Sequence, residues 1–313
     1  MEQRIVLSTE KLRKQYGDLV AVNDLSLHIP EGGVFGLLGP NGAGKSTAIN
    51  MICGWIPPTS GRLCLHGQPV RFGDQSVRNK TGICPQQLVL WKKLTCFEQL
   101  VHIAEMYGIP SRIARQRASQ LLEDMGLQEK KNHLAGNLSG GMQRKLNLIL
   151  ALMHDPEIIV LDEPDAGLDP QSKILVRDYI RALAQKRTVI LTTHNMDEAE
   201  RICQYVAIMD HGKLLEMDTT ERLKKKNSDL NVLEIELNDE ISANTARSLL
   251  QRSELNINEV NHHLFLSGNK LFEQLPEMIQ LLKNNSVEMG EIKFRERSLE
   301  DIFIQLTGKR LRE

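Results

Sequence analysis

The stretch Gly39-Pro40-Asn41-Gly42-Ala43-Gly44-Lys45-Ser46-Thr47 decides the fold class of this chain. It fits the pattern G-x-x-x-x-G-K-[ST], in which a glycine-rich turn between a strand and a helix directs its backbone N–H groups at a phosphate. The apolar run Val34–Leu38 enters this loop, and Ala48–Ile52 continues a helix beyond it. In such a loop Lys45 reaches the β- and γ-phosphates and the Ser46 hydroxyl holds Mg²⁺. The sequence therefore predicts a nucleotide site rather than an ordinary glycine-rich turn.

Composition narrows the classes of function. The chain has 313 residues, which suggests two domains, and its 39 basic and 40 acidic residues nearly cancel. No overall field attracts nucleic acid, so we expect no direct nucleic-acid binding. Its five cysteines are scattered without a C-x-x-C pair, which favours reduced thiols over disulfides or a zinc site. The longest uncharged apolar run, Leu146–Met153, is far shorter than the roughly 20 residues that span a bilayer, so any membrane role requires a partner.

Hydrophobic patterning predicts the order of the elements in the N-terminal two thirds of the chain. Gly17-Asp18 marks a turn between two strands, and Thr95-Cys96-Phe97-Glu98 is a capping box that opens a helix. Leu121, Leu122 and Met125 share one helical face that ends at Gly126. The predicted segments are strands at 4–15, 20–29 and 62–67, helices within 95–150, and strands at 158–161, 189–191 and 206–209 that alternate with helices, an α/β arrangement.

A polar hinge, Lys224–Ser228, precedes a change of pattern. Beyond it we predict strand 231–237, helix 242–252, strands 255–260 and 263–267, helix 270–284, strand 286–295 and helix 298–307. The order β-α-β-β-α-β is typical of a small ferredoxin-like α+β domain. His262-His263 is not favoured as a metal site, because adjacent strand residues point to opposite faces.

Two carboxylates follow the apolar run Ile158–Leu161. A buried strand that delivers acids at its C-terminal end is what a phosphate-loop site requires. Asp162 anchors Mg²⁺ through water and Glu163 points at the attacking water. The alternative, a strand followed by a solvated acidic turn, is disfavoured because the phosphate loop is in the same chain.

Leu138-Ser139-Gly140-Gly141-Met142-Gln143-Arg144-Lys145-Leu146 supplies a second anion site. Ser139 and two glycines precede a helix, whose N-terminus attracts negative charge. Here the sequence resembles the ATP-binding-cassette (ABC) ATPases, whose signature this is, over roughly residues 4–225. The resemblance implies an α/β nucleotide-binding domain over 1–225, with a helical lobe at about 88–150, and leaves 226–313 as an accessory domain.

The same resemblance implies roles for further residues. Tyr16 matches the aromatic that stacks on adenine, Gln86 the glutamine at the metal and the attacking water, and His194 the histidine on the γ-phosphate. Asp165 departs from the family's usual Thr or Ser, and the sequence leaves open whether it slows turnover or points outward. The predicted ATP contacts are Tyr16, Gly39, Pro40, Asn41, Gly42, Ala43, Gly44, Lys45, Ser46, Thr47, Gln86, Ser139, Gly140, Gly141, Gln143 and Asp169; the catalytic residues are Glu163, His194 and Lys45; the Mg²⁺ ligands are Ser46, Gln86 and Asp162.

As implied by the family, two such domains pair head to tail, with two ATP molecules between them. Each motif occurs once here, so the chain needs a second copy or a homologous subunit. Hydrolysis of ATP then drives a transmembrane permease through the region after Gln86, including Trp91 and Phe97, at the cytoplasmic face of the membrane.

The ending Ser298–Gly308 resembles ATPase subunits of daunorubicin-type drug and antibiotic exporters. Ser298 with Asp301 is also a helix cap, and Leu299, Ile302, Phe303 and Leu306 form one apolar face. We therefore expect export of a drug, antibiotic or lipid-like compound.

Two other functions compete with export. A soluble ABC ATPase of translation or DNA repair is disfavoured by the near-neutral charge, the single cassette and the exporter-like ending. A regulatory module without turnover is disfavoured because Glu163 and His194 are both present.

Overall fold

The computed structural model describes residues 4–225, 231–250, 255–260, 263–268 and 271–307. It divides into two compact units. The first comprises Met1–Asn195 with Ile202–Met217, and the second comprises Met196–Arg201 with Asp218–Glu313. The domain boundary near residue 225 stays a prediction.

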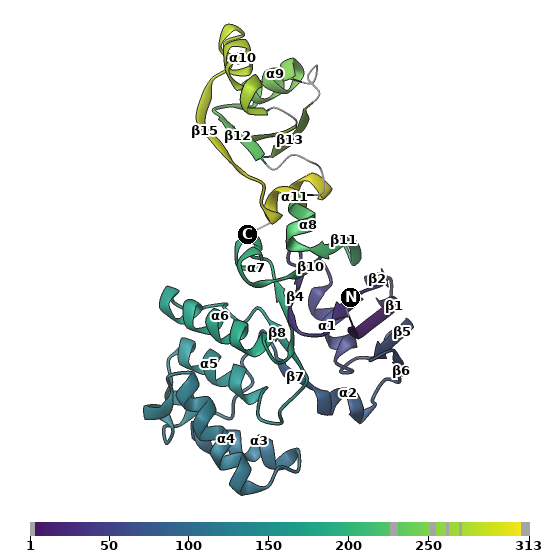
Figure 1. The fold of residues 1–313 in the computed structure, drawn as a ribbon, viewed down its shortest axis with the longest axis vertical. Helices are drawn as coiled ribbons and strands as arrows, with labels where there is room; N and C mark the ends of the chain where they lie inside the picture. The colour runs from purple at the N-terminus through teal and green to yellow at the C-terminus, as the bar shows by residue number, and fades with distance from the viewer. Residues whose placement is uncertain (1–3, 226–230, 251–254, 261–262, 269–270, 308–313) are drawn as a thin grey trace. The chain divides into compact units, whose positions relative to one another are not determined.

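A mainly parallel sheet forms the centre of the first unit (Figure 1). Its strands β10, β4, β9, β8 and β7 run parallel, and β8 and β9 are buried throughout, because they are covered on both faces. The predicted strands at 158–161, 189–191 and 206–209 are confirmed. In sheet order the strands are β11 (Lys213–Thr219), β10 (Tyr205–Asp210), β4 (Gly33–Leu38), β9 (Thr188–Thr193), β8 (Ile158–Asp162) and β7 (Thr81–Cys84).

A second, antiparallel sheet is organised around β1 (Ile5–Tyr16), and the predicted strand at 62–67 is found in it as β5. The prediction of one strand over 20–29 is wrong, because the segment forms two strands that pair with different halves of β1. Asp24 has a φ of 53°, and the hydroxyls of Ser26 and Thr9 accept backbone N–H groups at the break. The strands beside β1 are β2 (Leu19–Leu25), β3 (His28–Pro30), β5 (Ser60–Leu65) and β6 (Gln68–Val70).

The helices of the first unit lie beside the sheet and in a separate lobe (Figure 1). The predicted capping box is confirmed: the Thr95 hydroxyl accepts the Glu98 N–H at 3.1 Å, and the Glu98 carboxylate accepts the Thr95 N–H at 2.8 Å. Leu121, Leu122 and Met125 are buried, as predicted. The helices are α1 (Lys45–Ile52), α2 (Gln75–Lys80) and α6 (Pro170–Ala184), with α3 (Cys96–Met106), α4 (Ser111–Asp124), η1 (Gln128–Lys130), η2 (Ala135–Asn137) and α5 (Gly140–Leu150) in the lobe.

The second unit carries an antiparallel sheet with the strand order β13-β14-β12-β15, formed by β12 (Asn231–Leu237), β13 (Asn256–Val260), β14 (His263–Ser267) and β15 (Met289–Glu296). The predicted order β-α-β-β-α-β-α is confirmed. His263 lies 3.1 Å from Glu234, and His262 lies outside the described residues. The helices of this unit are α7 (Met196–Ile202), α8 (Thr220–Lys225), α9 (Glu240–Leu250), α10 (Leu271–Asn284) and α11 (Leu299–Thr307).

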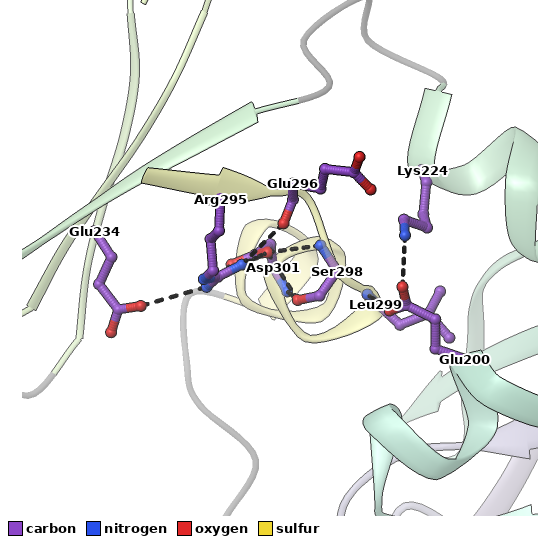
Figure 2. A network of polar contacts seen from close by, with 8 residues as sticks. All are labelled: Glu200, Lys224, Glu234, Arg295, Glu296, Ser298, Leu299 and Asp301. Carbon is purple, nitrogen blue, oxygen red and sulfur yellow. Dashed lines mark hydrogen bonds and ion pairs between the residues drawn. The ribbon is translucent and has the colours of Figure 1, made fainter. Parts of the chain in front are cut away.

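Polar contacts bind α11 to its neighbours within this unit (Figure 2). Arg295 donates to both Asp301 oxygens, at 2.5 and 2.8 Å, and to Glu234 at 3.4 Å. Glu200 of α7 accepts from the Lys224 ammonium at 2.5 Å and from the Leu299 N–H at 3.0 Å. The network therefore connects the sheet, the terminal helix, α8 and the helix that follows His194 in the chain.

The cap at the start of α11 is confirmed, because Asp301 accepts from the Ser298 N–H at 2.8 Å. The predicted apolar face is correct for Leu299, Ile302 and Phe303, which are buried, and wrong for Leu306, which is 39% exposed. Ile304 is buried instead, where it packs against Val232 and Phe265 of the sheet. The helix therefore contacts neighbours on more than one face.

The network predicts a pH-dependent stability. Burial alone would raise the pKa of the Asp301 carboxyl, but hydrogen bonds from Arg295 and Ser298 outweigh it and hold that pKa below its usual range. The stabilisation is therefore present above the unfolded-state pKa of about 3.9 and is lost as pH falls through the lower folded-state value. We expect Asp301→Asn to lower the free energy of unfolding by about 2 kcal/mol at pH 7, with the difference shrinking below about pH 4.

Urea denaturation followed by circular dichroism from pH 7 downward measures this difference. Asp18→Asn, in an exposed turn, is the control. A loss that is the same at every pH would contradict the role of the Asp301 charge.

Candidate nucleotide-binding site

Parallel pairing brings four loops of the first unit to one edge of the central sheet. Leu38 is in register with Thr193, Asp162 with Thr192, and Cys84 with Leu161. Because parallel strands all end at the same edge, the residues that follow them meet there. The loop after β4 leads to Lys45 and Ser46, Glu163 follows β8, His194 follows β9, and Gln86 follows β7.

The phosphate loop is packed against neighbouring backbone at its two fixed glycines. A Cβ at Gly39 would lie 2.2 Å from the Met209 carbonyl oxygen. Gly44 has a φ of 96°, and a Cβ there would lie 2.4 Å from the Ala21 carbonyl oxygen. Neither position admits a side chain without moving the backbone, so the loop needs glycine at both.

The intervening residues leave one side of the loop open. Asn41 and Gly42 are exposed, and Thr47 lies half-buried in the first turn of α1. The Ala43 N–H donates to Pro40 at 3.1 Å, and the Ala43 carbonyl accepts from Gly212 at 3.0 Å. These bonds hold the loop against the sheet while its tip faces solvent.

Lys45 is buried at the base of the loop. Its ammonium donates to the carbonyl oxygens of Gly39 at 2.8 Å and Pro40 at 3.0 Å. Burial lowers the pKa of Lys45, and the nearby carboxylates of Glu163 and Asp162 partly offset that effect. The carboxylates thus favour the charged form, which is the form that binds phosphate.

Asp162 lies between two hydroxyl groups. Its Oδ2 accepts from the Ser46 hydroxyl at 3.2 Å, and its Oδ1 accepts from the Thr192 hydroxyl. A hydroxyl and a carboxylate at this spacing are oxygen ligands of the kind Mg²⁺ prefers. Sequence reasoning did not single out Thr192, whose position in the strand next to β8 is visible only in the sheet order.

Glu163 is held by two of the predicted site residues. Its Oε1 lies 2.7 Å from the Nδ1 atom of His194, and its Oε2 accepts from the Gln86 amide at 2.9 Å. Its backbone has a φ of 48°, uncommon for a residue other than glycine, and its N–H donates to Thr192 at 3.1 Å. The structure therefore brings together Lys45, Ser46, Gln86, Glu163 and His194.

The second predicted anion site lies at the start of α5. Ser139 caps this helix and accepts the Met142 N–H at 3.3 Å; the two glycines form its first turn instead of preceding it. Ser139 and Gly140 are exposed, and a Cβ at Gly140 would meet nothing within 4 Å. In the described chain no hydrogen bond or ion pair joins Ser139–Gly141 to the phosphate loop, and Figure 1 shows α5 apart from α1.

Two predicted ATP contacts are exposed in this chain. Tyr16, at the end of β1, is 49% exposed, and the Lys14 ammonium lies 5.0 Å from its ring centre. Asp169 caps α6 by accepting the Ser172 N–H at 3.0 Å. Both side chains can be reached from outside the chain.

Two other side chains take partners within the chain. The Gln143 amide donates to Ala135 at 3.2 Å and to Leu138 at 3.1 Å, so it braces the segment before α5. The carboxylate of Asp165 lies 3.8 Å from the Lys173 ammonium of α6.

A partly enclosed groove of about 320 Å³ lies beside the segment that follows Gln86. Trp91, which is 42% exposed, lines it, whereas Phe97 does not and instead lies under the Lys131 ammonium, 4.0 Å from its ring centre. The apolar residues that line the groove include Trp55, Ile83, Val89, Leu90, Trp91, Ile103 and Tyr107.

Sequence reasoning missed Arg144, the buried basic residue that follows Gln143. It donates to backbone carbonyls of the loops that carry Gln86 and Glu163. Its place three residues after the glycine pair, in the same motif, was a signal, but its burial was not visible in the sequence.

A family model and two curated relatives all relate this chain to the ATP-binding proteins of ABC transporters. A protein-family model described as ABC transporter matches residues 22–166. The chain is 35% identical over 312 residues to the Nod factor export ATP-binding protein I of Cupriavidus pinatubonensis, covering 98% of this chain and 92% of that protein. It is 32% identical over 311 residues to the linearmycin resistance ATP-binding protein LnrL of Bacillus subtilis, covering 98% and 100%.

Solved structures of ATP-binding cassettes match about 70% of the chain. An ATP-binding subunit of an ABC transporter superposes with a TM-score of 0.65 at 27% identity, covering 71% of this chain and 92% of that chain. The dimeric ATP-binding cassette MJ0796, bound to ADP and Pi in a post-hydrolysis state, gives a TM-score of 0.63 at 25% identity, covering 68% and 98%.

The glycine contacts predict different costs for two substitutions. Gly39→Ala forces a methyl group against the Met209 carbonyl and should cost about 2 kcal/mol of stability. Gly140→Ala meets open space in a helix and should be neutral or slightly stabilising. Thermal denaturation of the two variants without nucleotide measures the difference, and equal midpoints would contradict the packing described here.

Proposed function

This chain belongs to the ABC transporter family of ATP-binding proteins, and we propose that it powers export of a compound through a separate membrane subunit. As a member of that family it is an ATPase subunit that binds and hydrolyses ATP. The observation that carries the hydrolytic part of the proposal is the Glu163 carboxylate, which lies between Gln86 and His194 at the sheet edge that also bears Lys45.

In this proposal Glu163 polarises the attacking water. A general base must lie within hydrogen-bond reach of the proton it takes, and the two contacts of Glu163 orient its carboxylate toward the site. Lys45 stabilises charge on the transferring phosphoryl group, and so does His194. Tyr16 stacks on the adenine, while the loop from Gly39 to Thr47 surrounds the phosphates with N–H groups.

The residues present fit Mg²⁺. Ser46, Asp162 and Gln86 supply oxygen atoms, and among the described residues no group of three His, Cys, Asp or Glu side chains forms a closed metal cage. Mg²⁺ usually binds through one or two side chains, waters and substrate phosphates, which suits such an open set. When bound, the ion neutralises phosphate charge.

The second half of the site comes, in this proposal, from another subunit. The exposed N-terminus of α5 attracts anions, and open space at Gly140 leaves room for a phosphate. Each motif occurs once in the chain. Ser139, Gly140 and Gly141, with Gln143 and Asp169 nearby, would therefore close over the ATP of a second copy or of a homologous subunit.

The apolar groove suits a segment of the membrane subunit. Exposed aromatic residues such as Trp91 and Tyr107 provide contact area, and Val89 places the groove three residues from Gln86. Within the described residues no helix is long and apolar enough to cross a bilayer. We therefore infer that the chain reaches the cytoplasmic face of the membrane through its partner.

Export is inferred from the relatives. Two of them carry export or resistance names, and their similarity extends over nearly the whole chain, including the second unit. A drug, antibiotic or lipid-like compound is the cargo class we infer. We further infer that 1–225 and 226–313 are separate domains and that the second is ferredoxin-like, supported by its antiparallel strand order. A role in translation or DNA repair has no support from these relatives.

The proposed base gives a direct prediction. Glu163→Gln should bind ATP as the parental chain does and lose at least about 100-fold in hydrolysis rate, because the amide cannot accept the proton. Phosphate release and fluorescent-nucleotide titration measure the two quantities. Glu157→Gln is the control, because Glu157 directly precedes β8 and so lies at the opposite end of that strand from Glu163. Parental turnover by Glu163→Gln would show that another group is the base.

The shared site gives a second prediction. Ser139→Ala and Gly140→Asp should weaken ATP-dependent dimerisation while each single chain still binds nucleotide, because the phosphate loop is untouched. Light scattering with and without ATP in a Glu163→Gln background measures the dimer. Unchanged dimer formation would count against a site shared between subunits.

A further inference from the structure

The side chain of Arg144 is buried in the first unit, and its hydrogen bonds go to backbone carbonyl oxygens. It is 4% exposed, and its guanidinium donates to five carbonyl oxygens. The acceptors are Pro85 at 2.9 Å, Gln86 at 2.6 Å, Asp162 at 2.7 Å, Pro164 at 3.2 Å, and Glu163.

Burying a charge costs several kcal/mol unless its donors are satisfied, so an arginine here requires a reason. Simple attachment of the helical lobe to the core could be achieved by apolar packing, and the same helix already buries the apolar side chains of Leu146 and Ile149. A planar guanidinium does something that apolar residues and lysine cannot, because its five N–H groups leave in fixed directions. In this structure the N–H groups of Arg144 donate to two separate segments of the chain, 85–86 and 162–164.

The two segments are the ones that carry the reacting groups. Pro85 and Gln86 follow β7, whereas Asp162 is the last residue of β8 and Glu163 and Pro164 follow it. Arg144 donates to backbone carbonyls of both segments, and the side-chain amide of Gln86 donates to the Glu163 carboxylate at 2.9 Å. The Glu163 backbone has the uncommon φ of 48°, a conformation that persists only where its surroundings hold it.

Asn147, one turn further along α5, extends the same contact. Its amide donates to the Cys84 sulfur at 3.3 Å and to Pro85 at 3.4 Å, and its oxygen accepts the Val89 N–H at 3.1 Å. The Gln86 loop is therefore attached to α5 at both ends, and Val89 and Asn147 also line the apolar groove.

We propose that Arg144 is a positioning residue for ATP hydrolysis. It sets the Glu163 and Gln86 backbones relative to each other and joins that pair to α5, the helix whose N-terminus bears Ser139. Engagement of this N-terminus by the nucleotide of a second subunit then orders the loops that hold the base. The inference rests on the proposed function, since it needs Glu163 to be the base.

Arg144→Lys tests this inference, because it keeps the charge but supplies three N–H groups from one atom. We expect the hydrolysis rate to fall about 100-fold, as small misplacements of reacting groups do, while the Kd for ATP changes less than about threefold. Arg117→Lys is the matched control: Arg117 donates to the Met153 carbonyl in the same lobe, away from these loops. This control should keep the parental rate. Arg144→Gln, which buries no charge, replaces the lysine variant if that one does not fold.

A double-mutant cycle separates positioning from general stability. If Arg144 acts through Glu163, Arg144→Lys should cost little further in single-turnover rate once Glu163→Gln is present. Full additivity of the two losses, or an equal loss of rate in Arg117→Lys, would overturn the inference. Parental-level hydrolysis by Glu163→Gln alone would instead refute the proposed base, so the two failures are distinguishable.

Discussion

Parallel pairing of β4, β9, β8 and β7 is the constraint on which the site depends. Each of these strands ends at the same edge, and the chemical groups follow within a few residues, so their separations are set by the sheet rather than by flexible loops. The Glu163 N–H donates to Thr192 at 3.1 Å, which continues the strand pairing one residue past β8. The base is thus placed by backbone hydrogen bonds, and its carboxylate is then oriented by Gln86 and His194.

The exposed N-terminus of helix α5 and the buried Arg144 one turn later make different contacts. Its N-terminus is exposed and is capped by the Ser139 side chain of the same segment, so it is available to an external anion. One turn later Arg144 is buried and bound to both catalytic loops. Because a helix is stiff over this length, a movement of its exposed N-terminus also moves the buried Arg144, with no loop between them. The cost of burying the guanidinium is understandable if that connection is functional.

Local motifs made much of this predictable. The phosphate loop, the capping box at Thr95 and the C-terminal element order depend on residues close in sequence, and the structure has them as predicted. The split of 20–29 into two strands was not predictable, because it depends on which half of β1 each part pairs with. The burial of Arg144 and the pairing of Asp165 with Lys173 likewise depend on contacts between distant or separately folded segments. The exposure of Leu306 could not be read from periodicity, which predicts a face but not what covers it.

The central claim is that the phosphate loop is half of a site whose other half belongs to a second subunit. Mixing two inactive variants, Lys45→Ala and Gly140→Asp, tests it most directly. In a head-to-tail dimer each mixed pair keeps one site with an intact loop and an intact α5 N-terminus. Random pairing makes half of the dimers mixed, so the mixture should recover up to about a quarter of the parental ATP hydrolysis rate. No recovery beyond that of either variant alone, with mixed dimers shown to form, would contradict the account.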